Sequence, residues 1–269
     1  MKINTIYNED CFVTMKKMEQ NNVKADIILT SPPYCTPNDD ARKYSDSRFD
    51  NYQVHYDVFE GFSSTEDYRQ WSCKLFTAYD KILNSNGVIL YNMSYTAKFP
   101  ELVYLVIADI INDTNFTVAD CISWKKKSAL PANQDCNRAT RICEFIFVFV
   151  RKDELLTFKT NKELNGVKYK NLFFNFIEAA NNDILNLKIN RLNSATFSTD
   201  LVMQLLTIYG KPGYLCYDSF MGTGTTAVGC KRFGCNFIGS ELSKNQVNFA
   251  NDRLIGAGVF KKTESKKLF

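Results

Sequence analysis

The sequence lacks the marks of an exported or membrane-bound chain. No apolar run approaches the roughly 18 residues that span a bilayer, and the first four residues, Met1 to Asn4, begin no apolar signal region. The nine cysteines are odd in number and include no C-x-x-C pair, which favours reduced thiols over a disulfide framework. We therefore expect a cytoplasmic protein with no membrane partner and no bound metal.

Strong charge and internal repeats are scarce as well. The net charge of +4 and the pI near 8.5 are mild for a nucleic-acid-binding protein. The basic residues gather between Lys125 and Lys170, and a short Lys-rich tail occupies 261–269. With 269 residues, 45% of them hydrophobic and 23% charged, the chain can bury a sizeable core as one large domain.

Two adjacent prolines mark the most distinctive turn of the chain. The segment Thr30-Ser31-Pro32-Pro33-Tyr34 closes the apolar run Ala25 to Leu29. Proline lacks an N–H donor and fixes φ, so the pair ends the strand and stiffens the backbone just after it. The Ser31 hydroxyl and the Ser31 and Pro32 carbonyl oxygens then become fixed acceptors beside the Tyr34 ring. Such a site could hold a flat, amino-bearing group at the carboxyl end of a strand, where open α/β sheets bind ligands.

The apolar periodicity predicts alternating strands and helices, as in an α/β fold. A short strand at Ile3–Tyr7 precedes Asp10, which is placed to cap the helical pattern that starts at Phe12. Periodicity is lost at 35–64, where we expect a long mobile loop. A helix is then expected at Tyr68–Ile82, ended by the turn Asn84–Gly87, and it is followed by a strand at Val88–Met93. The next helix is expected at Phe99–Ile111, opened by Pro100. Two strands, Phe116–Trp124 and Glu144–Val150, follow and are joined by a basic loop at 125–141.

The least regular part of the chain covers 152–194. We expect a small, partly extended inserted region here, and the aromatic cluster Leu172–Phe176 reads as core because apolar triplets usually bury themselves. Order resumes at Ser198-Thr199-Asp200, a capping signal for a helix Leu201–Tyr209.

A glycine-rich motif lies near the other end of the chain. The strand Tyr214–Asp218 leads into Phe220-Met221-Gly222-Thr223-Gly224-Thr225, which opens a helix, and a second strand ends before Glu241, about twenty residues past the first glycine. In this βαβ arrangement glycines let the backbone approach a nucleotide, and the acid binds ribose hydroxyls. A lone G-x-G is weak evidence, but the full order of elements predicts a nucleotide-type cofactor.

Together the two motifs resemble those of the amino-directed DNA methyltransferases that use S-adenosylmethionine (SAM), in their beta arrangement. Members carry (Asp/Asn/Ser)-Pro-Pro-(Tyr/Phe) first and Asp-x-Phe-x-Gly-x-Gly-Thr later, and this chain has Ser31–Tyr34 and Asp218–Thr225 in that order. The stretches Ser123–Lys126, Arg141–Ile146 and Ala195–Ser198 are similar too. The resemblance implies a Rossmann-like SAM-dependent methyltransferase sheet with helices on both faces, divided into a catalytic part at 1–151, a target-recognition region at 152–194, a SAM-binding part of the same domain at 195–260 and a tail at 261–269.

The resemblance also implies roles for single residues. Ser31, Pro32, Pro33 and Tyr34 would be catalytic. Asp10 and the Cys11 backbone would hold the adenine of SAM and Glu241 its ribose, so the two acids are expected in one pocket. The residues expected to bind the cofactor are Asp10, Cys11, Thr196, Phe197, Asp218, Phe220, Gly222, Gly224, Thr225 and Glu241.

The chemistry of the two motifs fits this family. An exocyclic amine is a poor nucleophile because its lone pair is delocalised into the ring. Acceptors from Ser31 and Pro32 would hold the amino hydrogens and aim the lone pair at the SAM methyl, while Tyr34 stacks on the base. Catalysis would be positioning and electrostatic preorganisation on a base flipped out of the duplex.

The leading Ser31 indicates the target. In the family a leading Ser mostly accompanies N4-cytosine methylation and Asp usually accompanies N6-adenine methylation, so we expect cytosine N4 and keep adenine N6 as the alternative. Methylation at carbon 5 needs a cysteine nucleophile, and the Pro-Cys dipeptide that accompanies that chemistry is absent.

Partners follow from the same resemblance. Double-stranded DNA is the expected substrate, in the prokaryotic cytosol or nucleoid, and a homodimer and a cognate restriction enzyme are possible companions by analogy. Charge and position between the motifs give four candidate DNA contacts, Lys125, Lys127, Arg138 and Arg141. For Arg138 and Arg141 an ordinary surface role or a salt bridge with Glu144 stays open.

Three other functions remain open from the sequence. A methyltransferase of RNA or of protein amide nitrogen shares the Pro-Pro-Tyr chemistry, but the motif order speaks against it. A nicotinamide dehydrogenase could use Gly222 to Ala227 and would leave Ser31–Tyr34 without a role. A DNA-binding module without activity would retain the fold only.

Overall fold

The computed structural model describes residues 1–35, 62–95, 99–127, 139, 141–165, 168–170, 173–183 and 196–257. The expected loop at 35–64 falls almost wholly outside these residues, as do most of the basic loop at 125–141 and the tail at 261–269. Within the described ranges no helix combines the length and the apolar character needed to cross a bilayer.

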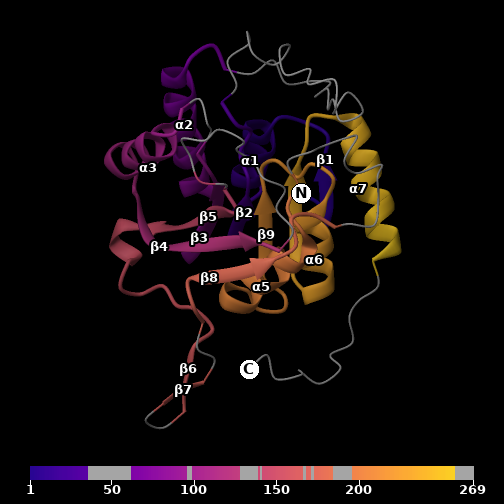
Figure 1. Cartoon of the computed structure of the whole chain (residues 1–269). Coiled ribbons are helices and arrows are strands. Elements are labelled where there is room, and N and C mark those ends of the chain that lie inside the picture. Colours follow the sequence, from indigo (N-terminus) through magenta and orange to yellow (C-terminus); the bar gives the residue numbers. More distant parts are fainter. Residues whose placement is uncertain are drawn as a thin grey trace.

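The described chain folds into an eight-stranded sheet with helices on both faces, as predicted (Figure 1). The strand order is β1-β10-β9-β2-β3-β5-β4-β8, and all neighbouring pairs are parallel except the two that include β5. The strands are β1 (Thr5–Tyr7), β2 (Ala25–Thr30), β3 (Leu83–Met93), β4 (Phe116–Lys126), β5 (Cys143–Arg151), β8 (Phe176–Ala179), β9 (Leu215–Asp218) and β10 (Asn236–Ser240).

Two hydrophobic cores lie on the two faces of the sheet. Alternate residues of β2 divide between them, since Ile27 and Leu29 point to one core and Ile28 to the other. Burial on both faces explains why this strand reads as an uninterrupted apolar run. One face is covered by α1 (Cys11–Gln20), α2 (Thr65–Ile82) and α3 (Leu102–Asp113), and the other by α5 (Thr199–Tyr209), α6 (Thr225–Phe233) and α7 (Lys244–Gly256).

Most helix starts follow the capping signals. Asp10 caps α1, where its Oδ1 accepts a hydrogen bond from the Phe12 N–H at 2.8 Å, and Ser198 caps α5. The helix expected at Phe99–Ile111 begins later, at Leu102, so Pro100 precedes it instead of forming its first turn. The predicted caps therefore hold for α1 and α5, and the predicted start of α3 is wrong by one short turn.

The turn predicted at Asn84–Gly87 is absorbed into β3. This strand begins at Leu83, and its pairing with β2 jumps from Ala25↔Leu83 to Ile27↔Val88, so the four residues between them bulge out of the ladder. Asn86 adopts a positive φ of 56° there. The polar cluster correctly marks a break in regular pairing, but the strand starts before it.

The region expected as an insertion at 152–194 is only partly separate from the main sheet. A short 3-10 turn, η2 (Lys152–Glu154), is followed by a hairpin of β6 (Glu163–Asn165) and β7 (Lys168–Lys170) that projects from the body in Figure 1. The chain then returns as β8, which pairs with β4 and completes the main sheet. Phe174 and Phe176 are 61% and 50% exposed, so the expectation that this cluster is core is wrong for both.

Candidate active site

The two sequence motifs meet at the point where the winding of the sheet reverses. From β2 the chain passes through α2 to β3 on one side, and from β9 it passes through α6 to β10 on the other. In open α/β sheets the crevice outside the carboxyl ends of such a strand pair is the usual ligand site. The last residues of the two strands touch, since the Thr30 hydroxyl donates to Asp218 Oδ1 at 2.8 Å.

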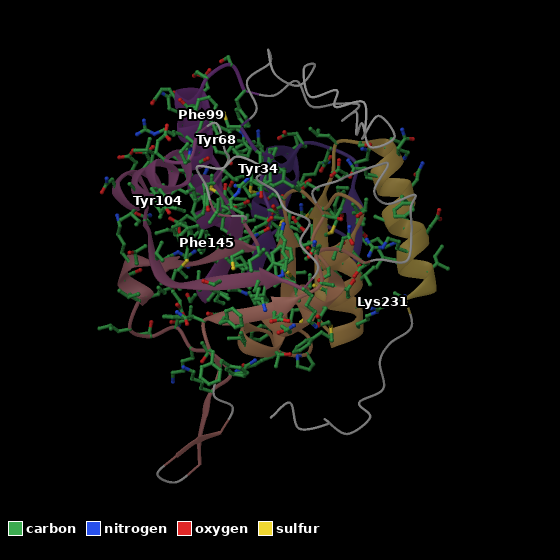
Figure 2. The ribbon with its side chains drawn as sticks, in the orientation of Figure 1. Tyr34, Tyr68, Phe99, Tyr104, Phe145 and Lys231 are labelled. Carbon is green, nitrogen blue, oxygen red and sulfur yellow. The ribbon has the colours of Figure 1, made fainter. Side chains whose placement is uncertain are left out.

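The Pro-Pro turn continues directly from β2. Ser31 and Tyr34 are half-buried, and Cys35 is buried with its Sγ 3.8 Å from the carbonyl oxygen of Ser64, the residue that caps α2. Tyr34 lies above the carboxyl edge of the sheet beside Tyr68 (Figure 2). It borders a small hollow whose other lining residues are Cys35, Tyr68, Met93, Ser94, Phe99, Leu102 and Val103.

The glycine loop needs its glycines for conformation and for packing. Gly222 and Gly224 have φ values of 53° and 83°, in the left-handed region that L side chains rarely adopt. A Cβ on Gly224 would lie 2.7 Å from the Cβ of Ala250 in α7. Glycine at this position therefore lets α6 begin in close contact with α7.

Glu241 leaves the end of β10 and turns back to the glycine loop. Its Oε2 accepts a hydrogen bond from the Gly222 N–H at 2.9 Å, and its Oε1 accepts one from the Ser243 N–H at 2.8 Å. These two bonds orient the acid toward the glycine loop.

Asp10 and Glu241 follow adjacent parallel strands at the same edge of the sheet. The Glu241 N–H donates to the Tyr7 carbonyl oxygen at 3.0 Å, and the Asn8 side-chain amide donates to the Glu241 carbonyl oxygen at 3.0 Å. The Cys11 carbonyl oxygen accepts from the Tyr217 hydroxyl at 3.3 Å. The segments that carry the two acids are thus neighbours, and a shared ligand stays a prediction.

Asp218 is more enclosed than the sequence suggested. It is 1% exposed, and its Oδ2 accepts from the Thr226 hydroxyl at 2.5 Å while its Oδ1 accepts from Thr30 and from the Phe220 N–H at 3.0 Å. Burial raises the pKa of the Asp218 carboxyl to about 6, against the lowering effect of these three hydrogen bonds.

Thr196 and Phe197 differ in what surrounds them. The Thr196 Oγ1 is buried and has no hydrogen-bond partner among the described residues, which makes it a candidate donor or acceptor for a ligand. Phe197 packs against the core on the α5–α7 face.

A network of hydrogen bonds and an ion pair around Arg253 was not predicted from the sequence. The Arg253 guanidinium, on α7, donates to the Thr223 carbonyl oxygen at 2.7 Å and to the Thr225 hydroxyl at 3.1 Å, and it forms an ion pair with Asp183. Asp183 in turn accepts from the Thr199 N–H at 2.8 Å. Arg253 thus links the glycine loop to α7 and, through Asp183, to the start of α5. Nothing in the sequence near Arg253 indicates this role, because its partners are far away along the chain.

The candidate DNA-contacting lysines have acidic neighbours. Lys125 Nζ lies 2.8 Å from Glu178, and Lys127 Nζ lies 3.5 Å from Asp200. Both lysines are well exposed and lie at or just past the end of β4, at the carboxyl edge. Their role toward DNA stays a prediction, and any phosphate must compete with these carboxylates.

Arg141 has a partner other than the one considered for it. Its guanidinium donates to the Tyr95 carbonyl oxygen and lies 4.8 Å from the centre of the Tyr95 ring. Glu144 forms its ion pair with Lys126, so the suggested bridge between Glu144 and Arg141 is wrong. Arg138 lies outside the described residues.

Comparisons with known proteins agree with this geometry. The type II methyltransferase M.HinfI of Haemophilus influenzae is 24% identical over 261 residues, which cover 94% of this chain and 68% of that enzyme. The crystal structure of the M1.HpyAVI–SAM complex gives a TM-score of 0.64 at 25% identity, covering 93% of this chain and 98% of that one. The PvuII DNA methyltransferase (cytosine-N4-specific) gives 0.66 at 16% identity, covering 97% and 87%.

A family profile covers both motifs and the sheet between them. The profile of the N6/N4-type DNA methylases matches residues 25–252, which include the Pro-Pro turn, the glycine loop and seven of the eight strands of the described sheet, β1 being the exception. On this match the chain belongs to the DNA methylase family that modifies exocyclic amino groups.

Proposed function

We propose that this chain transfers a methyl group from SAM to the exocyclic N4 amino group of a cytosine flipped out of duplex DNA. One observation carries the proposal: the hydrogen bond from Thr30 to Asp218 joins the strand that delivers Ser31 to the strand that opens the glycine loop. Acceptors for an amine and a cofactor loop are thereby neighbours, although they are distant in the sequence.

The described residues fit SAM as the methyl donor. When bound, SAM supplies an electrophilic methyl group on a sulfonium. Glu241 is oriented by Gly222, and its carboxylate is of the type that accepts hydrogen bonds from ribose hydroxyls. The buried hydroxyl of Thr196, which has no hydrogen-bond partner within the described part of the chain, suits the polar methionine end, and the positive φ values of Gly222 and Gly224 let the backbone come close.

The chain's own part in the reaction is to hold and orient the base. The Ser31 hydroxyl and the carbonyl oxygens of Ser31 and Pro32 accept the amino hydrogens, which directs the nitrogen lone pair away from the ring. The Tyr34 ring stacks on the base. These groups are fixed before the base arrives, because the prolines and β2 hold the backbone, so little reorganisation is needed during transfer.

Recognition of DNA is assigned to the carboxyl edge of the sheet. Lys125 and Lys127 lie at the end of β4 there, and the remainder of the region at 152–194, together with the basic loop at 125–141, supplies further contacts. The neutral Ser31 hydroxyl is the feature that favours cytosine N4 over adenine N6.

The test is a direct product analysis. Purified protein is incubated with SAM and duplex DNA, and the digested nucleosides are identified by mass spectrometry. N4-methylcytosine is the expected product; N6-methyladenine would overturn the cytosine assignment, and unmodified DNA would overturn the function.

A Ser31→Ala variant tests the role of the hydroxyl in the same assay. Methyl transfer should fall roughly 100-fold, the typical cost of one lost active-site hydrogen bond, while the affinity for SAM changes less than about twofold. Ser85→Ala, on the exposed bulge at the opposite edge of the sheet, should match the wild type in both measurements. A Ser31→Ala variant that loses SAM binding instead would mean that Ser31 belongs to the cofactor site.

A further inference from the structure

We propose that Asp218 is a positioning residue for methyl transfer: its buried carboxylate fixes the end of β2, and with it Ser31, relative to the glycine loop, and does not contact the methyl donor. The inference rests on the proposed function. Asp218, which the sequence assigned to the cofactor pocket, would instead connect the strand that carries Ser31 to the glycine loop.

The contacts of the carboxylate reach three separate elements. Thr30 donates from the end of β2 at 2.8 Å, Phe220 from the glycine loop at 3.0 Å, and Thr226 from the first turn of α6 at 2.5 Å. With the residue 1% exposed, no side of the carboxylate is open to a ligand in the crevice. The same enclosure makes it a rigid spacer between β2 and the loop.

The neighbours of Asp218 secure the loop from the other face of the sheet. The Ser219 and Tyr79 hydroxyls are 2.7 Å apart, and the Phe220 ring centre lies 5.7 Å from that of Trp71 in α2. The loop is therefore held by α2 through these two contacts and by β2 through the Asp218 carboxylate. Losing the Asp218 contacts should shift Ser31 relative to the loop while the loop keeps its shape.

No cation balances the buried charge in the contacts described. The titratable groups that interact with Asp218 are Cys216 and Tyr217 on β9, and Cys216 in turn contacts Cys230 on α6. The hydrogen bond with Cys230, together with burial, raises the pKa of Cys216, and burial raises that of Tyr217, so both are neutral near pH 7. The β2 partner is the Thr30 hydroxyl. Protonation of Asp218 would turn one acceptor oxygen into a donor, so that Thr226 must accept at Oδ2, and the bonds from Thr30 and Phe220 to Oδ1 would weaken because they would no longer end on a carboxylate.

The first experiment is Asp218→Asn, which keeps the size of the side chain and removes its charge. We expect the kcat for methyl transfer to fall at least tenfold while the Kd for SAM, measured by calorimetry, stays within about threefold. The wild type should lose kcat below about pH 6, and the variant should not show this step. A Kd that rises as much as kcat falls would assign Asp218 to the cofactor and overturn the proposal.

The chain provides a matched control at the opposite edge of the same strands. Asp26 on β2 accepts from the Leu215 N–H of β9 at 2.8 Å and from the Asn84 side chain at 2.8 Å. Asp26→Asn should leave kcat and its pH profile as in the wild type. An equal loss of kcat in both variants would reduce the effect to general loosening of the β2–β9 pair and would overturn the proposal.

A second readout does not depend on methylation. Amide hydrogen exchange at Phe220, whose N–H donates to Asp218, should be faster in Asp218→Asn and in wild type below pH 6 after correction for intrinsic rates. Unchanged exchange would contradict the positioning role even if DNA is methylated. Wild type that exchanges as expected but methylates no DNA amine would overturn the proposed function alone. Should Asp218→Asn not fold, Thr30→Val removes one donor and should show the same kcat loss at unchanged SAM affinity.

Discussion

Two acids at opposite edges of the sheet, Asp80 and Asp218, are held in opposite ways. At the amino edge, Arg151 at the end of β5 donates to the Asp80 carboxylate at 2.5 Å and to the carbonyl oxygens of Leu83 and Asn84 at 2.9 and 3.1 Å. At the carboxyl edge, Asp218 accepts from neutral groups only. The Asp80 carboxylate is thus paired with a cation, and the Asp218 carboxylate keeps an uncompensated charge next to the residues proposed to act on substrate.

The pKa shifts of Asp80 and Asp218 have opposite signs because only Asp80 has a charged hydrogen-bond partner. Burial acts to raise the pKa of Asp80, but hydrogen bonds from Arg151 and Asn115 outweigh it and lower the pKa. Burial raises the pKa of Asp218 to about 6 because its partners carry no charge. Asp80, which is paired with a cation far from the proposed site, therefore stabilises the fold. Asp218, at the proposed site, destabilises the fold through its buried charge while holding β2 and the glycine loop in a defined geometry.

The largest effect on stability should come from the amino edge. Arg151→Met removes the cation and takes the donor away from the Asp80 carboxylate and from the carbonyl oxygens of Asp80, Leu83 and Asn84, so the free energy of unfolding should fall by about 3 kcal/mol. Urea unfolding measures this, and the kcat per native molecule should not change. Arg151→Lys keeps the charge without the planar fork and should lose less. A fall in kcat at unchanged stability would erase the distinction between the edges.

The pH dependence of stability should separate the two acids. Asp218 has a raised pKa, so its ionised form opposes folding by roughly 3 kcal/mol above about pH 6, and this cost is relieved as the pH falls from about 6 to about 4, the ordinary pKa of an aspartate. Asp80 has a lowered pKa, so its contribution is present above about pH 4 and is lost below it.

Unfolding curves at several pH values test both signs. Relative to wild type, Asp218→Asn should gain stability as the pH rises from about 4 to about 6.5, whereas the advantage of wild type over Asp80→Asn should shrink below about pH 4. Parallel curves for wild type and Asp218→Asn would show that Asp218 does not titrate in this range.

The smallest effect on stability should come from the exposed lysines. Lys125→Gln at the carboxyl edge removes an exposed ion pair with Glu178, so the unfolding midpoint should not change measurably. If Lys125 meets a phosphate, the slope of log affinity for DNA against log salt should fall by about one. Fluorescence anisotropy measures that slope. Lys81→Gln, whose lysine pairs with Glu19 at 3.8 Å near the amino edge, is the matched control, and equal slopes for both variants would contradict a phosphate contact by Lys125.

Local signals were enough to predict much of the fold and the motifs. Two prolines after an apolar run end β2 whatever surrounds them, and Asp10 caps α1 through a hydrogen bond two residues away. The glycine loop was likewise recognisable, because a positive φ requires a residue type that can be read from the sequence.

The parts that were missed depend on contacts between distant segments. The bond from Thr30 to Asp218 spans 188 positions, and nothing near either residue indicates it. The four-residue strand β8 has too short a pattern to predict pairing with β4. Arg141 could not be separated from an ordinary surface arginine, because its partner, Tyr95, belongs to the segment after another strand.

The reversed direction of β5 has a consequence for how this enzyme family can vary. Because β4 and β5 form an antiparallel pair, β4 ends at Lys126 and β5 begins at Cys143 on the same edge of the sheet, the edge at which β2 leads into Ser31, and these two residues anchor the segment between them. A segment anchored in this way can be lengthened or exchanged without altering the register of any strand. Grafting the corresponding segment of another methylase between these two residues should therefore yield folded chimaeras with altered sequence preference.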